Sequence, residues 1–131
     1  MDARSLARYS LAGIRLVNGV AALLAPQVVA RRLGADESQP ALVYVMRMFG
    51  VRTVFIGAEL LLLQDPDRIA QALRVGTVIH TSDALSAAAA GWCGTLRPKA
   101  AVLATAISTV NVALSLVAQW PRRGACGTGA C

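Results

Sequence analysis

The stretch that decides the fold runs from residue 41 to residue 63 and reads ALVYVMRMFGVRTVFIGAELLLL. It stays predominantly apolar for the ~20 positions that a helix needs to cross ~30 Å of hydrocarbon. Polar residues bound it, since Ser38-Gln39-Pro40 precedes it and Gln64-Asp65-Pro66 follows it. Proline suits the first turn of a helix, so each boundary opens a new helix. The stretch is therefore predicted to be a membrane-spanning helix.

Three further apolar segments of similar length repeat this pattern. The predicted spans are about 7–26, 41–63, 69–92 and 99–120. They predict an all-α fold, an integral membrane four-helix bundle that occupies residues 1–123. Residues 124–131 are rich in Gly and Ala, lack apolar periodicity and are predicted to be a flexible tail. Residues 27–33 carry two arginines and predict a short interfacial helix that stops at Gly34.

Composition also indicates a membrane protein of one domain. Hydrophobic residues make up 56% of the 131 residues and charged residues 15%, against about 45–50% and about 25% in an average soluble domain. A soluble chain of this size buries only about 60–70% of its surface, so it could not hide so many apolar side chains from water.

The basic excess, 13 Lys and Arg against 7 Asp and Glu, is spread along the chain. No basic stripe interleaved with aromatic residues is present, so nucleic acid is not an expected partner. Contact with anionic membrane lipids is expected instead. Basic residues near the predicted loops weakly favour a multi-pass protein of the plasma (inner) membrane with both termini in the cytoplasm.

Polar side chains inside the apolar segments are the candidate functional residues, because such groups are costly in hydrocarbon and normally face the bundle interior. This intramembrane polar network comprises Arg15, Asn18, Arg52, Glu59, Arg74, His80, Asp83 and Asn111. Asp65 is a good N-cap and Pro66 a good first helical residue, so 41–63 and 69–92 are predicted to form a tight antiparallel hairpin. In this hairpin Arg52 lies between His80 and Asp83 in depth. The same register places Glu59 level with Arg74.

Three interpretations of the network remain open at this point. It is structural, holding the helices together through buried ion pairs; or Glu59, Asp83 and His80 form a proton or substrate pathway; or an arginine left without a counter-charge binds an anion or a lipid head group. No nucleophile with a base, phosphate-binding loop or metal-ligand set stands out in the sequence, so we expect no catalytic, cofactor or metal site and no enzymatic activity.

Small residues near the end of the third segment and the start of the fourth predict close helix packing. Such a face is also a possible docking surface for a helix of another transmembrane subunit, and it allows a homo-oligomer. The residues of this predicted surface are Ala87, Ala88, Ala89, Ala90, Ala101 and Thr105.

Three motifs in order resemble a known group of proteins: Arg-x-x-x-Gly from Arg15, Phe-Gly-x-Arg-x-x-x-x-Gly from Phe49, and His-x-x-Asp from His80. Over residues 5–120 the chain resembles the uncharacterised four-helix small membrane proteins of actinobacteria, which are distantly similar to DoxX-like proteins. The resemblance implies a fold and no activity. Such proteins also resemble accessory subunits of larger transporters, including lipid-import systems.

The sequence therefore leads us to expect a non-enzymatic accessory or scaffold subunit of a larger membrane complex, such as a lipid-import transporter. One alternative is a small proton-coupled transporter that uses Glu59 and Asp83. The other is a membrane enzyme that modifies lipids or quinones.

Overall fold

The computed structural model describes residues 2–120, and within that range the chain forms five helices and no strand. The helices are α1 (Ala3–Leu24), α2 (Pro26–Arg32), α3 (Pro40–Leu62), α4 (Pro66–Trp92) and α5 (Pro98–Gln119). The four long helices cover the four predicted apolar segments, and α2 covers the predicted interfacial helix. The predicted tail, 124–131, lies outside the described residues.

Local signals in the sequence set the helix boundaries. Pro occupies the first turn of α2, α3, α4 and α5, where its missing N–H costs nothing. The side chains of Asp2 and Asp65 accept hydrogen bonds from the backbone nitrogens of Ser5 and Asp67, each at 3.0 Å, and so satisfy free donors at the start of α1 and α4. Gly34 follows α2 with a φ of 75°, which a side-chain-bearing residue rarely adopts.

Helices α1 and α3 pack tightly because two glycines let their backbones touch. A Cβ atom on Gly50 would lie 2.6 Å from the backbone nitrogen of Leu23 and 2.7 Å from the carbonyl oxygen of Gly19. About two turns further along α3, a Cβ on Gly57 would lie 3.2 Å from the carbonyl oxygen of Ala12. This is the small-residue packing by which membrane helices approach closely.

Helices α4 and α5 form the second close pair. A Cβ on Gly91 would lie 2.6 Å from the Cβ of Ala101, and Ala101 is only 6% exposed. The small residues at this end therefore serve an internal helix contact. Ala101 is not available to a partner helix, so the docking surface predicted from the sequence loses this residue, whereas Ala88 and Ala89 are exposed.

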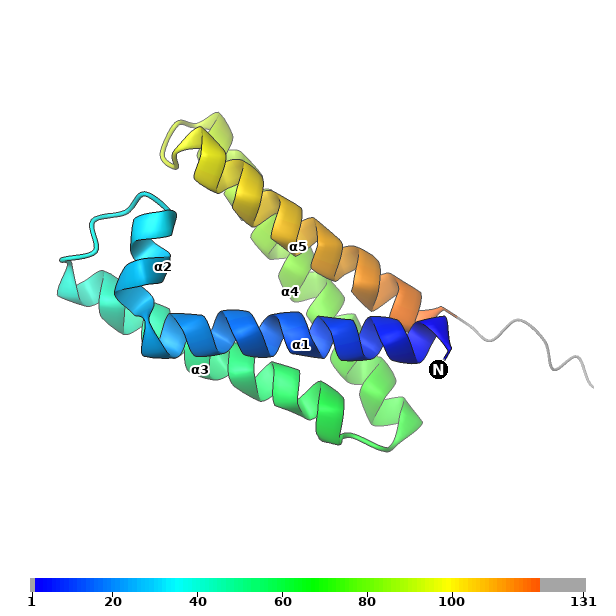
Figure 1. Ribbon diagram of the computed structural model, residues 1–131. Helices are drawn as coiled ribbons and strands as arrows, with labels where there is room; N and C mark the ends of the chain where they lie inside the picture. The colour runs from blue at the N-terminus through cyan, green and yellow to red at the C-terminus, as the bar shows by residue number, and fades with distance from the viewer. Residues whose placement is uncertain (1, 121–131) are drawn as a thin grey trace, which may run out of the picture.

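The two pairs cross obliquely and leave an open angle between them (Figure 1). α1 contacts both α3 and α5, whereas α3 and α4 hardly touch beyond the loop that joins them. The tight α3–α4 hairpin predicted from the sequence is therefore wrong, because the glycine face of α3 is taken by α1. The apolar core lies where the pairs meet, and it contains Ala7, Leu11, Ala12, Leu60, Leu73 and Ala118.

Two arginines of α1 tie the helix ends together beside this core. Arg8 donates from Nε to the carbonyl oxygen of Leu60 at 2.6 Å and from Nη2 to that of Leu63 at 2.5 Å. Arg4 donates from Nε to the carbonyl oxygen of Ala118 at 3.3 Å. Carbonyls in the last turn of a helix lack intrahelical partners and carry partial negative charge, so the guanidinium groups stabilise the ends of α3 and α5.

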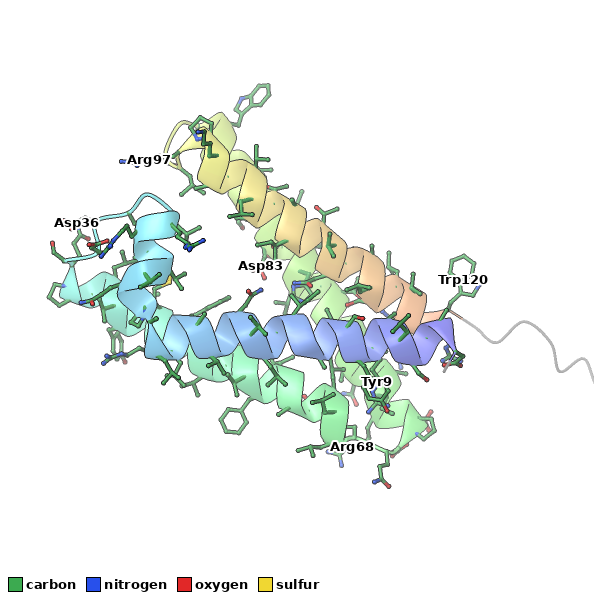
Figure 2. The ribbon with its side chains drawn as sticks, in the orientation of Figure 1. Tyr9, Asp36, Arg68, Asp83, Arg97 and Trp120 are labelled. Atoms are coloured by element: carbon green, nitrogen blue, oxygen red, sulfur yellow. The ribbon has the colours of Figure 1, made fainter. Side chains whose placement is uncertain are left out.

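At the other end of the molecule the two pairs are splayed, and there the loops approach one another. The side chain of Arg97, at the start of α5, lies so close to Gly34 that a Cβ on Gly34 would overlap its Cδ. Figure 2 shows Arg97 pointing from the α4–α5 turn toward α2. Arg31 of α2 forms an ion pair with Glu37 in the connection to α3, and this contact raises the pKa of Arg31 above its ordinary value.

Two of the helices in residues 2–120, α3 and α5, are long and apolar enough to cross a membrane. A third candidate is the α1–α2 pair, which bends by 107°, if the pair counts as one span. Many large apolar side chains are exposed on the outer faces, among them Phe55, Leu62, Val78, Leu85 and Val102. A surface of this kind needs cover other than water, so the protein has the features of a membrane protein.

Candidate functional site

A cavity of about 410 Å³ lies in the angle between the two helix pairs. All five helices contribute to its walls, which are mainly apolar. Its polar lining consists of Arg15, Asn18, Arg52, Thr53, His80, Asp83, Ser108 and Asn111. Six of the eight residues of the predicted polar network thus line one cavity, and the other two, Glu59 and Arg74, do not. The side chain of Asp83 extends from α4 into the angle between α1 and the α4–α5 pair (Figure 2).

Arg15 of α1 is the most deeply placed charge in the cavity, with 3% of its surface exposed. Its Nε and Nη2 atoms lie 3.0 and 2.5 Å from Nε2 of His80. A guanidinium group can only donate, so Nε2 accepts and the ring proton is on Nδ1. That nitrogen faces Oδ2 of Asp83 at 3.8 Å. The three side chains form a chain from α1 to the rim of the cavity.

Gly76 of α4 makes this position possible for Arg15. A Cβ on Gly76 would lie 3.1 Å from Nη2 of Arg15, so the absence of a side chain provides the space that the guanidinium group occupies. The role of Gly76 becomes visible only once the side chain of Arg15 is known to reach α4.

Arg52 of α3 is the second positive charge of the cavity. Within residues 2–120 it makes no hydrogen bond and no ion pair within 4 Å, although it is close enough to Asp83 and Arg15 for an electrostatic interaction with each. The cavity therefore carries two guanidinium groups and one carboxylate, with a neutral imidazole between them. One positive charge has no matching carboxylate.

Asn111 of α5 contributes a side-chain carbonyl oxygen that accepts no hydrogen bond within residues 2–120. Its side chain is 5% exposed, and no donor in the described part of the chain reaches its Oδ1 atom. A buried carbonyl group without a partner costs about 1–3 kcal/mol. A water molecule or a ligand with an O–H or N–H group in the adjoining cavity would satisfy this acceptor.

The remaining two residues of the predicted network lie elsewhere, contrary to the predicted pairing of Glu59 with Arg74. Glu59 lines a separate hollow with Arg68 and Gln71. Arg74 lines a third hollow near the N-terminus, and its Nε donates to the carbonyl oxygen of Ala70 at 3.3 Å. The pairing fails because α3 and α4 diverge, so residues at equal depth on the two helices do not meet.

Sequence reasoning missed two hydroxyl residues of the cavity, Thr53 and Ser108. A signal for Ser108 was present, because it precedes Asn111 by three residues and so shares its face of α5. Thr53 carried no such signal. In the structure its hydroxyl donates to the carbonyl oxygen of Phe49 at 2.8 Å, as threonines in helices commonly do.

An apolar cavity with an excess of positive charge can accommodate an amphipathic anion. Its volume lies within the range of roughly 300–1,000 Å³ that is typical of small-molecule sites, and such sites combine apolar walls with a few convergent polar groups. Comparisons with protein-family models, curated proteins and solved structures give no match for this chain. A functional hypothesis for the protein therefore depends on the geometry of the cavity itself.

Proposed function

We propose that this protein is a four-crossing, non-enzymatic membrane protein that binds an amphipathic anion, such as a lipid with an acidic head group, between its two helix pairs. The observation that carries the proposal is a largely apolar cavity with an excess positive charge and a buried, unpartnered acceptor. Arg52 and Arg15 would attract the head group, and the apolar walls would accept the chain.

The unpartnered Oδ1 of Asn111 adds a requirement on the head group, which must carry an O–H or N–H as well as a negative charge. A phosphate monoester meets this requirement, because its second pKa is about 6 and a fraction retains one hydroxyl near neutral pH. A fully ionised carboxylate has no donor. We therefore propose a lipid phosphate monoester as the preferred class of ligand.

The same contacts speak against a purely structural network. A buried ion pair that serves stability is matched in charge and saturated with hydrogen bonds. Here the only hydrogen-bond partner of Arg15 within residues 2–120 is an imidazole, and Arg52 has none. The contacts also support a non-enzymatic role, because the Nε2 lone pair that His80 would use as a general base is occupied by Arg15.

A binding measurement in neutral detergent tests the proposal. We expect dodecyl phosphate to raise the melting temperature of the purified protein, and dodecanol or inorganic phosphate to raise it far less. Arg52→Gln should weaken the affinity for dodecyl phosphate at least about ten-fold, which corresponds to about 1.4 kcal/mol. Arg47→Gln is the matched control, since Arg47 is an exposed arginine of α3 outside the cavity. Equal effects of the two variants, or of dodecanol and dodecyl phosphate, would refute the proposal.

The four crossings require that α4 spans the membrane, although it carries Arg74, His80 and Asp83. Cysteine labelling can test this helix. In a chain whose three native cysteines are replaced by serine, we expect Gln64→Cys, just before α4, to react with a membrane-impermeant maleimide only from the cytoplasmic side. Cys93, the exposed residue that ends α4, should react only from the other side in a chain that lacks Cys126 and Cys131. Labelling of both positions from one side contradicts a crossing by α4.

A further inference from the structure

The hollow that contains Glu59 adjoins the cavity and shares two residues with it. It has a volume of about 290 Å³, lies between the end of α3 and the start of α4, and is lined by Glu59, Arg68 and Gln71. Ile56 of α3 and Ile79 of α4 line both the hollow and the cavity. The two spaces therefore adjoin at this pair of isoleucines, and we refer to the two together as the groove.

The residues of α3 that line the groove follow one face of the helix. Phe49, Thr53, Ile56 and Glu59 recur at intervals of three or four residues, which is the repeat of a single helical face. With Met46 included, the groove extends roughly 20 Å along α3 at 1.5 Å per residue. This length is a large part of the ~30 Å of hydrocarbon in a bilayer.

The packing of the helices permits the groove to widen. The backbones of α1 and α3 are in contact at Gly19 and Gly50, and α4 and α5 are in contact at Gly91 and Ala101. Each pair is therefore closely packed, whereas α3 and α4 hardly touch. Relative rotation of the two pairs would separate Ile56 from Ile79 without breaking either pair.

We propose that Ile56 and Ile79 form a hydrophobic gate in this groove, and that the acidic head group of a bound lipid passes the gate to cross from one membrane leaflet to the other. The inference rests on the proposed function, because it takes the same ligand. In this mechanism the chain of the lipid stays in the bilayer while the head group moves along the polar groove. Moving a charged group through bare hydrocarbon costs far more free energy than moving it along a polar groove.

The charges assign a resting place on each side of the gate. The cavity holds one positive charge in excess, whereas Glu59 and Arg68 balance each other in the second half of the groove. An anionic head group thus rests in the cavity and occupies the second half only in transit. Arg68 receives it there, and Glu59 disfavours its retention by repulsion.

Reconstitution into phosphatidylcholine vesicles with a trace of tail-fluorescent phosphatidic acid tests the gate. Dithionite quenches the label in the outer leaflet, and the slow phase that follows reports transfer from the inner leaflet. We expect wild-type protein to accelerate this phase over protein-free vesicles, and Ile56→Ala/Ile79→Ala to accelerate it at least about ten-fold further by lowering the barrier. Val78→Ala/Val102→Ala is the matched control, because these valines are 70% and 69% exposed on α4 and α5, and it should behave as wild type.

The milder Ile56→Val/Ile79→Val variant, which retains most of the packing, should give an intermediate rate if the alanine variant fails to fold. Transfer unchanged in both isoleucine variants, while dodecyl phosphate binding is normal, overturns the gate and leaves the proposed binding function intact. Loss of dodecyl phosphate binding by wild-type protein overturns the proposed function itself. Equal acceleration of tail-fluorescent phosphatidylcholine would show a non-selective defect and refute the assignment of an acidic head group.

Discussion

Gly50→Ala is expected to destabilise the protein, although alanine is the better helix former. The added methyl group would lie 2.6 Å from the backbone nitrogen of Leu23 and 2.7 Å from the carbonyl oxygen of Gly19. Backbone atoms cannot turn aside as a flexible side chain can, so α1 and α3 must move apart. We expect a loss of about 1–3 kcal/mol in the free energy of unfolding, measured by thermal denaturation in neutral detergent.

Gly13→Ala makes the identical chemical change on the same helix pair and is the control. Nothing lies within 4 Å of a Cβ on Gly13. The substitution should leave stability unchanged or raise it by up to about 1 kcal/mol through helix propensity. A stabilising effect of Gly50→Ala, or equal effects of the two substitutions, would show that α1 and α3 do not meet as described.

Arg15→Met is expected to lower the affinity for dodecyl phosphate strongly while leaving the free energy of unfolding nearly unchanged. The guanidinium group is 3% exposed and is hydrogen-bonded to an imidazole instead of a carboxylate. Replacing an incompletely matched buried charge with an apolar side chain of similar length is often neutral or stabilising. We expect a free energy of unfolding within about 1 kcal/mol of wild type or above it, together with an affinity for dodecyl phosphate at least about ten-fold lower.

Arg8→Met should give the opposite pattern. Arg8 holds the carbonyl oxygens of Leu60 and Leu63 and does not line the cavity. Hydrogen bonds from a charged donor contribute about 1.5–3 kcal/mol each when buried. Because Arg8 is only partly buried, we expect a smaller total loss of stability, about 1–2 kcal/mol, with unchanged binding. A loss of about 3–5 kcal/mol in Arg15→Met would instead establish the polar network as structural.

Much of the local structure could be predicted from the sequence because its causes are local. The prolines at positions 26, 40, 66 and 98 begin helices in the structure, and Gly34 ends α2 as expected from its tolerance of positive φ. Length and hydropathy predict α3 and α5 as spans. The same measure is weaker for α4, since side chains that line the cavity lower its hydropathy.

Six polar residues of the cavity could be predicted from the sequence, whereas the geometry of the site could not. Ionisable residues in apolar segments normally turn toward the bundle interior, and Arg15, Arg52 and Asp83 line one cavity. The pairing of the helices depends on close backbone contacts such as that of Gly19 with Gly50. The spacing of glycines along the sequence does not predict which residue each of them will contact. The predicted pairing of Glu59 with Arg74 failed for this reason.

The contact between Arg97 and Gly34 has a mechanical consequence. The two helix pairs meet at the apolar core beside the N-terminus, which acts as a pivot between them. The α2–α3 loop with Gly34 and the α4–α5 turn with Arg97 lie at the ends of the pairs farthest from this pivot, like the ends of two lever arms. A force applied there has the longest moment arm. One side chain resting on one glycine therefore restrains the angle between the arms more effectively than an equal contact beside the pivot.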